Sequence, residues 1–587
     1  MQFVNAMDNL GNRKTIPSKE GTMVRVTVGH SRQDKLLELW NMLKRGTDSS
    51  EIATRVDAIV RSAAPNKGKT TERTELLILL CRLIIQKRDC RNGGGEKDVV
   101  FDAIMALRKT LPETAMALVH LLPTFGYFKD LTLLATKCKE SKDEQLLTEC
   151  VTAIAAGIQT GSVLACKWAP REKKSAAWLA DLVRRKLQLS KSNYRKTLSK
   201  VMKENAVNVP EVLMSSKRFR EIEPTKIPSR CLKVHRRAFL DEDKNGARRH
   251  VEDSDPDLAD REICRLKFEE VLKDPTKALK GARNFPYELV ADVRKNGAPT
   301  DLQRQTMNAM WAAIVVEVKK QIAEQKAKDA LAKTGETKDS DVEAVSFDPS
   351  LMVPMADVSG SMTCCDSVPM NNSIALSLLL AEVGHPAFRG RILTFHTAPT
   401  WVVFDDDTDF VTRVQLLEQA PWGGSTNFEA AMELIAEVVR TQRLSESQVP
   451  GITCFSDMKF DAAHGHCGYG HTGNVWNTHY ERVEALFAKV GKEISGTAYK
   501  APRICFWDLA NSGGQSQPGF PVTSGDQGVQ LISGFSPALL KLVMTGERLD
   551  TPWETFLKAV TDDRYDEVEK AALSAKEIDP MFVMVDK

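Results

Sequence analysis

Residues 351–361 read Leu-Met-Val-Pro-Met-Ala-Asp-Val-Ser-Gly-Ser, and the organisation of the C-terminal half can be inferred outward from them. The first six residues form an apolar run with the length of a buried strand. The run ends at Asp357, and a helical apolar pattern follows over residues 373–383. Polar residues between a strand and a helix lie at the carboxyl edge of an α/β sheet, so we expect Asp357, Ser359 and Ser361 to meet there.

The rest of the C-terminal half alternates between strand and helix patterns. Short apolar runs predict strands at residues 391–395, 400–403, 451–455, 503–507 and 529–532. Apolar residues at helical spacing predict helices at residues 408–419, 428–440 and 480–490, followed by closing helices. Strands that alternate with helices favour a mostly parallel, doubly wound α/β sheet over residues 350–587.

Two further polar residues occupy positions like that of the Asp357 motif. Thr426 lies in a Gly-Gly-Ser-Thr-Asn turn before a helix, and Asp457 directly follows the strand at residues 451–455. Hydroxyl and carboxylate oxygens are hard donors that suit Mg²⁺ or another hard divalent cation. We therefore predict a metal site whose ligands are Asp357, Ser359, Ser361, Thr426 and Asp457. The alternative is that Asp357 and the serines only cap a helix.

The N-terminal half has the pattern of successive amphipathic helices joined by short turns with Gly or Pro. The clearest predicted helices are at residues 97–107, 113–122, 130–138, 143–158, 178–187, 194–203, 264–272 and 302–324. Such helices favour stacked hairpins, as in a HEAT-like α-solenoid, although no strict repeat is visible. We expect four parts: an N-terminal extension (1–34), an α-helical repeat domain (35–325), a linker (326–349) and the α/β domain (350–587).

Charge is distributed unevenly along the 587 residues. The net charge is +3, yet residues 351–587 carry −12 and residues 151–250 carry +14. This asymmetry indicates a polyanionic partner for the helical half, because Lys and Arg neutralise phosphates and nearby aromatic rings stack on bases. The predicted RNA-binding residues are Lys167, Trp168, Arg171, Lys173, Lys174, Arg184, Arg185, Lys191, Tyr194, Arg195 and Lys196, with Lys186 and Lys200 beside them. The alternative is a solvated helical face.

Other features narrow the class of protein. A content of 42% hydrophobic and 27% charged residues is typical of a globular protein and excludes a disordered or collagen-like chain. Apolar runs are too short for a membrane span, no secretory signal is visible, and the scattered cysteines favour a reducing compartment. We therefore expect a cytoplasmic protein without a membrane partner. Because no nucleophile or general base can be named, we also expect a protein that is not an enzyme.

Three weaker signals have ordinary explanations. Residues 66–70 resemble the end of a phosphate-binding loop, but the glycine that should precede them is Ala63. Gly93, Gly94 and Gly95 favour a turn between helices over a phosphate nest. The residues His464, His466, Cys467, His471 and His479 fit no standard zinc-binding spacing, and a Gly-rich loop is the simpler interpretation. The acidic run at residues 405–407 favours a turn.

The Asp-Val-Ser-Gly-Ser run at residues 357–361, with Thr426 and Asp457 on later elements, resembles the metal-ion-dependent adhesion site (MIDAS) of the von Willebrand factor A fold. The resemblance extends over residues 350–560. It implies a Mg²⁺ ion that is not catalytic. It also implies that one coordination position stays open for an acidic group of a protein partner.

The order of a helical array and then such a domain resembles the Ro/TROVE proteins, on residues 86–97 (Gln-Lys-Arg-Asp-Cys-Arg-Asn-Gly-Gly-Gly-Glu-Lys) and 118–131. A closer resemblance is to the TROVE-related DUF2828 group. Its motifs are similar to Lys167-Trp-Ala-Pro-Arg171, Tyr194-Arg-Lys-Thr-Leu198, Ile227-Pro-Ser229, Phe455-Ser-Asp-Met-Lys-Phe-Asp461 and Phe506-Trp-Asp-Leu509. In that last motif the family has Trp-Asn-Leu-Arg, whereas this chain has Asp508 and Ala510. The resemblance implies a ribonucleoprotein that binds structured RNA, or RNA with single-stranded ends, without altering it.

Two hypotheses follow. The first is an RNA-binding protein that holds RNA on the basic helical surface and a partner through Mg²⁺. The second is a protein–protein scaffold that uses the metal site alone, without RNA. The sequence leaves the oligomeric state and the closure of the helical array into a ring undecided.

Overall fold

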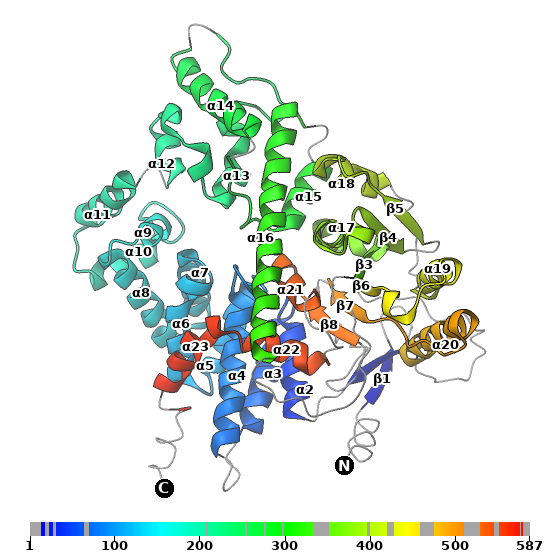
Figure 1. The fold of residues 1–587 in the computed structure, drawn as a ribbon. Coiled ribbons are helices and arrows are strands. Elements are labelled where there is room, and N and C mark those ends of the chain that lie inside the picture. The colour runs from blue at the N-terminus through cyan, green and yellow to red at the C-terminus, as the bar shows by residue number, and fades with distance from the viewer. Residues whose placement is uncertain are drawn as a thin grey trace. The chain divides into compact units, whose positions relative to one another are not determined.

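The computed structural model of the chain describes residues 13–17, 23–27, 31–63, 70–205, 209–252, 255–274, 277–295, 299–333, 351–395, 399–419, 428–457, 475–509, 529–544, 551–575 and 577–578. The chain forms two compact units, and neither is continuous in sequence. The unit that contains the large sheet, here called the sheet unit, combines Met1–Ser62, Pro286–Ala291 and Val318–Asp562. The helical unit combines Ala63–Phe285, Asp292–Glu317 and Asp563–Lys587. Figure 1 labels the elements of both.

The large sheet has six strands among the described residues, in the order β5-β4-β3-β6-β7-β8. They are β3 (Met352–Asp357), β4 (Arg391–Phe395), β5 (Thr400–Val403), β6 (Gly451–Ser456), β7 (Ile504–Asp508) and β8 (Val529–Ser533). β4 and β5 pair antiparallel, and every other pair is parallel. The predicted mostly parallel sheet is therefore confirmed. A smaller antiparallel pair joins β1 (Arg13–Pro17) to β2 (Met23–Thr27).

The central strands are buried along their whole length, which explains why they are apolar runs and do not alternate with polar residues. Their helices are α17 (Cys364–Val383), α18 (Phe410–Gln419), α19 (Phe428–Thr441) and α20 (Val475–Ser495). Side chains of α19 and α20 form one hydrophobic cluster with β3, β4, β6 and β7, around Met355, Phe487 and Phe506. Outside that cluster, α17 packs against β3, β4 and β6. Both faces of the sheet are therefore covered.

Two N-terminal helices, α2 (Arg32–Met42) and α3 (Ser49–Ser62), belong to the sheet unit with α21 (Leu540–Val543) and α22 (Pro552–Val560). The rings of Trp40 and Phe556 meet edge to face at 5.7 Å between centroids. The hydroxyl of Ser533 donates to the backbone carbonyl of Asn41 at 2.9 Å. The expected domain start at residue 35 therefore differs from the structure, because α2 packs on α3 and also on β8 and α22 of the sheet unit.

The helical unit contains α4 (Thr70–Arg88), α5 (Asp98–Arg108), α6 (Pro112–Phe125), α7 (Phe128–Ser141), α8 (Glu144–Gln159), α9 (Val163–Trp168), α10 (Ala177–Lys186), α11 (Lys191–Glu204), α12 (Pro210–Ser215), α13 (Ser229–Phe239) and α14 (Leu258–Lys273), with short 3₁₀ turns at Phe219–Glu221 and Pro224–Lys226. Neighbours in sequence pack together, as α5 does on α6 and α7 on α8. This helical layout agrees with the predicted one. The regular HEAT-like or TROVE-like repeat stays a prediction.

The ends of the two units also differ from the expected boundaries. The last helix, α23 (Asp566–Ser574), packs on α4 and α6 in the helical unit, although we expected all of residues 350–587 to form one domain. The guanidinium of Arg82 holds it there, at 2.9 Å from Asp566 and 2.5 Å from Glu569. α15 (Pro286–Lys295) and α16 (Asp301–Lys333) are each shared between the units, so α16 extends into the expected linker.

The last residue of α4 and the first residue of the turn after it each form an ion pair. Nη2 of Arg88 lies 2.6 Å from Asp130, and both side chains are 2% exposed. Asp89 accepts hydrogen bonds from Arg564 at 2.6 Å and 3.1 Å. The glycines that follow form a turn that leads into α5, as predicted, and Gly95 has a φ of +68° with the ring of Phe285 where a Cβ would lie. These residues of the TROVE-like stretch thus have a structural role.

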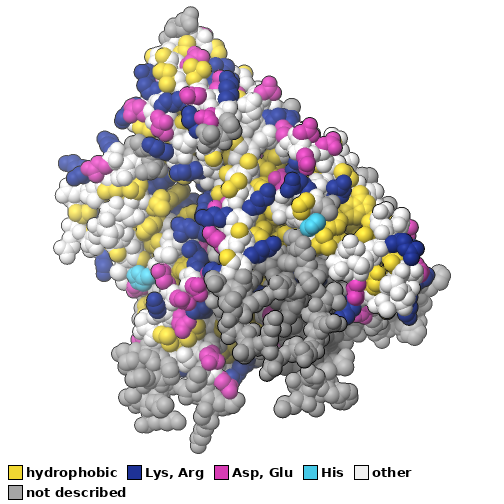
Figure 2. Space-filling view, in the orientation of Figure 1, with side chains coloured by type: hydrophobic (Ala, Val, Ile, Leu, Met, Phe, Trp, Pro, Cys, Tyr) yellow, Lys and Arg dark blue, Asp and Glu magenta, His cyan; other side chains and the backbone are white. Residues whose placement is uncertain are grey.

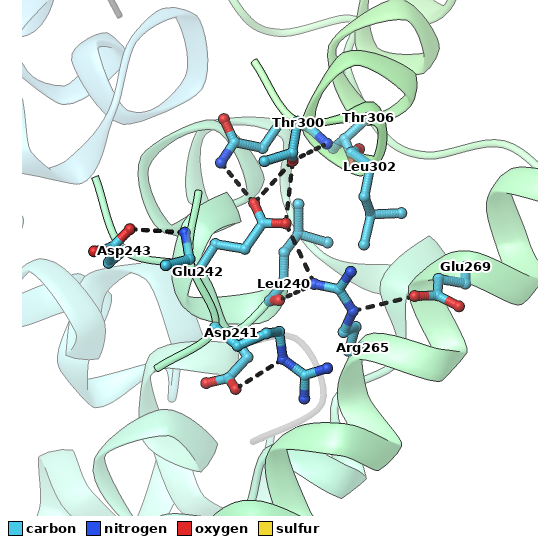
Figure 3. A network of polar contacts seen from close by, with 12 residues as sticks. Leu240, Asp241, Glu242, Asp243, Arg265, Glu269, Thr300, Leu302 and Thr306 are labelled. Carbon is cyan, nitrogen blue, oxygen red and sulfur yellow. Dashed lines mark hydrogen bonds and ion pairs between the residues drawn. The ribbon is translucent and has the colours of Figure 1, made fainter. Parts of the chain in front are cut away.

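A buried polar network joins the segment after α13 to α14 and the start of α16 (Figure 3). Glu242 is 2% exposed and accepts hydrogen bonds from Arg265, Thr300 and Gln303. Arg265 also donates to Glu269 at 3.1 Å. Because the carboxylate is surrounded by its own donors, we assign this network to stability. No helix in the part of the chain that the structure describes is long and apolar enough to cross a membrane.

Candidate cation site and basic surface

The Asp357 motif lies at the point where the order in which the chain adds strands to the sheet reverses. β3 is the first strand of the large sheet in the chain; the chain next forms β4 on one side of it and later β6 on the other. The carboxyl ends of β3 and β6 therefore flank the switch point, where open α/β sheets bind their ligands. Ala356 of β3 is paired in register with Phe455 of β6. This pairing places Asp357 and Asp457 at the same edge of the sheet.

The donor groups at this edge are buried and linked to one another. Asp357 is fully buried, Ser359 is 2% exposed and Asp457 is 6% exposed. One oxygen of Asp357, Oδ1, accepts from the backbone N–H of Ser359 at 2.9 Å. The other, Oδ2, accepts from the hydroxyl of Ser456, the last residue of β6. The Asp357 carboxylate is thus held in one orientation by groups from β6 and from the turn after β3.

Burial raises the pKa of Asp357 to about 7, and the charge of Asp457 is the second cause of the rise. The hydrogen bonds from Ser456 and Ser359 act in the opposite direction but are smaller. Two neighbouring buried carboxyl groups repel each other when both are ionised. A cation between them would remove this repulsion, so the chemistry of the donor set fits a hard divalent ion.

Asp357, Ser359 and Asp457 are the predicted ligands whose placement can be checked, and the structure brings them to the same edge of the sheet. The side chain of Ser361 and the whole of Thr426 lie outside the described residues. So does the His464–Cys467 part of the histidine cluster, together with His471. For His479 only the helical backbone of α20 is described.

The same edge contains groups that sequence reasoning missed. Asp508, at the end of β7, forms an ion pair with Lys44, which follows α2 in the chain. Both side chains are buried, at 6% and 2% exposure. Ser456 was also missed, although it directly precedes Asp457. A sequence signal existed for Ser456, because it directly follows the strand predicted at residues 451–455, but nothing in the sequence relates Lys44 to Asp508.

The basic stretch of the helical unit divides into paired and unpaired side chains. Lys167 bonds to Glu211 at 2.7 Å, and Arg195 lies 3.7 Å from Glu172. Arg184 and Arg185 both pair with Asp181, at 2.5 Å and 2.6 Å. These pairs reduce the positive charge that is available to a polyanion. Figure 2 shows one face of the molecule, on which acidic side chains lie among many of the Lys and Arg side chains.

The unpaired cations are lysines of α10, α11 and the segment before α10. Each is exposed and forms no ion pair with any described residue: Lys173, Lys174, Lys186, Lys191, Lys196 and Lys200. Their charge is therefore open to phosphate groups. These six lysines therefore remain candidates for binding RNA.

Two predicted RNA-binding residues have structural roles instead. Tyr194 is 1% exposed, and its hydroxyl donates to the carbonyl of Pro170 at 3.1 Å. A buried ring cannot stack on a base, so the prediction for Tyr194 is wrong. Arg171 donates to the carbonyl of Cys166 at 2.9 Å, and burial lowers its pKa. Both residues connect α9 and the segment after it to α11, because Tyr194 of α11 bonds to Pro170 and Arg171 contacts Cys166 of α9 and Met202 of α11.

The exposed aromatic side chains lie instead at the junction of α7 and α9. Trp168 is 38% exposed, and the ammonium groups of Lys129 and Lys167 lie 5.4 Å and 5.6 Å from its ring centroid. Tyr127, two residues before Lys129, is 46% exposed. Trp168 was predicted for this surface, whereas Tyr127 and Lys129 were missed. An aromatic residue close to a lysine could have indicated a nucleic-acid surface here, but these residues lie outside the basic stretch at 151–250.

Two comparisons with known proteins bear on this geometry. Residues 352–587 match the model of a domain of unknown function, DUF7788. The DUF7788 match begins with β3 and includes Asp357, Ser359 and Asp457. Uncharacterized protein L728 of Acanthamoeba polyphaga mimivirus is 28% identical over 394 residues, which are 66% of this chain and 58% of the viral protein. The chain thus spans less than two thirds of that relative's length. Neither the DUF7788 description nor the viral one names an activity.

Proposed function

We propose that this chain is a binding protein that holds a divalent cation, Mg²⁺ in the first instance, at the carboxyl edge of its sheet, and through it an acidic group of a protein partner. The observation that carries the proposal is the pair of buried carboxyl groups of Asp357 and Asp457 beside Ser359 at the switch point of the sheet. Two buried carboxylates that repel each other are costly without a counter-charge. A cation would supply it.

In this proposal the protein supplies fixed oxygens and leaves part of the coordination sphere open. Asp357, Ser359 and Asp457 would hold the ion, with Ser361 and Thr426 as the further ligands that the MIDAS resemblance implies. Hard divalent cations take six or more oxygen ligands, so protein oxygens alone need not complete the set. A carboxylate of a partner is the natural group to fill the open position. Ser456 would orient Asp357, because its hydroxyl bonds to Oδ2.

Thermal unfolding of the full-length protein with and without Mg²⁺ tests this proposal. We expect Mg²⁺ to stabilise the wild type, by about 2.7 kcal/mol at 100 times its dissociation constant. Asp357→Asn should abolish this response and stabilise the metal-free protein, because it removes one of two repelling buried charges. The control Asp406→Asn changes an exposed residue of the acidic run at 405–407 and should keep the full response. Equal responses of both variants would contradict the proposal.

The Mg²⁺ response should also depend on pH. Because the pKa of Asp357 in the folded protein is about 7, above the ordinary value of 3.8, the folded state holds this proton more tightly than the unfolded state does. Asp357 therefore costs increasing stability as the pH rises from about 4 to about 7. Mg²⁺ competes with that proton. The Mg²⁺-induced rise in unfolding temperature should be small near pH 5 and larger near pH 8; a response that is independent of pH would argue against Asp357 as a ligand.

A second function, RNA binding by the helical unit, is favoured by one specific observation. Trp168 presents an exposed ring with two lysine ammonium groups near it, and unpaired lysines of α10 and α11 lie in the same stretch of chain. Aromatic rings flanked by cations suit single-stranded nucleic acid, since every base can stack and every phosphate can pair. We propose that single-stranded RNA binds here.

Affinity for a single-stranded RNA oligonucleotide tests this second function. Trp168→Ala should weaken binding by about 1–3 kcal/mol, and Trp168→Phe should retain most of it, because a phenyl ring still stacks. Changing Lys173, Lys174, Lys191 and Lys196 to Gln should flatten the log–log salt dependence by about 0.7 for each phosphate that is no longer neutralised. Changing Arg184 and Arg185, which pair with Asp181, should matter less. Wild-type affinity in Trp168→Ala would refute the stacking role.

A further inference from the structure

Three potential metal ligands meet in the helical unit, and one of them, Glu211, is the ion-pair partner of Lys167. Glu211 lies in the first turn of α12, and Cys231 and His235 lie on α13, which Figure 1 shows beside it. Their ligand atoms all lie within 4.8 Å of one another. Because Cys231 and His235 are four residues apart on one helix, they project from the same face.

The surroundings of Glu211 prepare one of its oxygens for a ligand. Oε1 accepts a hydrogen bond from Lys167 at 2.7 Å. Oε2 is enclosed, and apart from the weak thiol donor of Cys231 it has no hydrogen-bond partner among the described residues. An enclosed carboxylate oxygen without a strong donor is unfavourable. Lys167 thus orients the carboxylate, as outer-shell partners of metal ligands do, and leaves Oε2 directed at the other two groups.

We propose that Glu211, Cys231 and His235 form a zinc site that ties α12 to α13. One thiolate, one imidazole and one carboxylate are ligands that Zn²⁺ accepts together in tetrahedral geometry. Bonds of about 2.0–2.3 Å hold such ligand atoms about 3.5 Å apart, so rotation of the partly exposed Glu211 and His235 side chains closes the set. Water occupies the fourth position on the exposed side.

Zinc binding at this site releases one proton. Burial, with the charge of Glu211 as the second cause, raises the pKa of the Cys231 thiol to about 12, so the thiol is protonated in the metal-free protein. Zn²⁺ replaces the thiol proton, which passes to solvent, and a zinc–sulfur bond forms. No electron is transferred. The apparent zinc affinity should therefore rise with pH.

The test uses the full-length protein after removal of bound metal, titrated with Co²⁺ as a spectroscopic probe and then with Zn²⁺. We expect the wild type to show a thiolate-to-cobalt charge-transfer band that Zn²⁺ abolishes. Cys231→Ala should lose the band and at least about 100-fold in affinity, and Lys167→Met should lose about tenfold. The matched control is Cys264→Ala, which changes another buried cysteine whose pKa burial raises to about 12, and which should bind like the wild type.

Comparison of the variants separates this site from other ligands in the chain. The histidine cluster at residues 464–479 also includes Cys467, so the decisive quantity is the difference between wild type and Cys231→Ala. Identical spectra and zinc stoichiometry for these two proteins would overturn the proposal. Circular dichroism of the metal-free variants checks their folding. If Cys231→Ala does not fold, His235→Gln, at a partly exposed position, carries the test and should show the same loss of affinity.

Discussion

Asp130→Ala is expected to lower the free energy of unfolding of the helical unit by about 3–5 kcal/mol. The carboxylate of Asp130 pairs with the guanidinium of Arg88, and both side chains are 2% exposed. It also accepts from the backbone N–H of Tyr127 at 2.8 Å at the start of α7. Removing it leaves a buried cation without its anion and a helix end without its cap. Chemical denaturation followed by circular dichroism measures the change.

A matched substitution distinguishes the buried ion pair from an ordinary helix cap. Asp143 caps α8 by accepting from Leu146 at 3.0 Å, but its side chain is 25% exposed. Asp143→Ala should therefore cost only about 1 kcal/mol. The double variant Arg88→Met with Asp130→Ala should recover part of the loss, because no charge is then left buried. Equal losses for Asp130→Ala and Asp143→Ala would show that the buried pair has no special cost.

Lys44→Met is expected to destabilise the sheet unit by a similar amount, about 3–5 kcal/mol. Methionine retains much of the apolar volume, so the change removes mainly the charge. Asp508 then loses its lysine partner at the edge of the sheet that already carries Asp357 and Asp457. Thermal and denaturant unfolding of the full-length protein measure the loss, which Mg²⁺ should partly offset if a cation binds at this edge.

The control for Lys44 lies on the helix just before it. Lys35→Met makes the same substitution on α2, at a half-buried position that forms no ion pair with any described residue. It should change stability by less than about 0.5 kcal/mol. Replacing Lys44 and Asp508 together with apolar residues should restore much of the loss. If Lys44→Met is as stable as Lys35→Met, the ion pair does not contribute to the stability of the sheet unit.

The secondary structure was largely predictable because its signals are local. The strand predicted at residues 391–395 has those bounds in the structure, and the one at 451–455 extends by one residue. Both are largely apolar runs between polar turns, which is the local pattern of strands that are buried on both faces. The helices predicted at 130–138 and 143–158 were placed by their apolar period and by the short break between them.

The candidate site was predictable in part for the same reason. Asp357 and Asp457 each follow a predicted strand, and a parallel sheet brings the carboxyl ends of its strands to one edge. The prediction for Tyr194 failed because a residue's type does not reveal which face of a helix is covered. The positive charge that the basic stretch offers to a polyanion was overestimated, because the pairing of Arg184 and Arg185 with Asp181 depends on side-chain geometry.

Sequence alone was enough to establish the order of helices and strands, the alternation that produces a mostly parallel sheet, and the polar residues that end its strands. The folded chain was needed for everything that joins distant residues. Those features are the assignment of α2 to the sheet unit and α23 to the helical unit, the Lys44–Asp508 pair, and the meeting of Glu211 with Cys231 and His235. The reason is physical: apolar period and turn residues act within a few positions, whereas burial and ion pairing depend on which surfaces meet after the whole chain has packed.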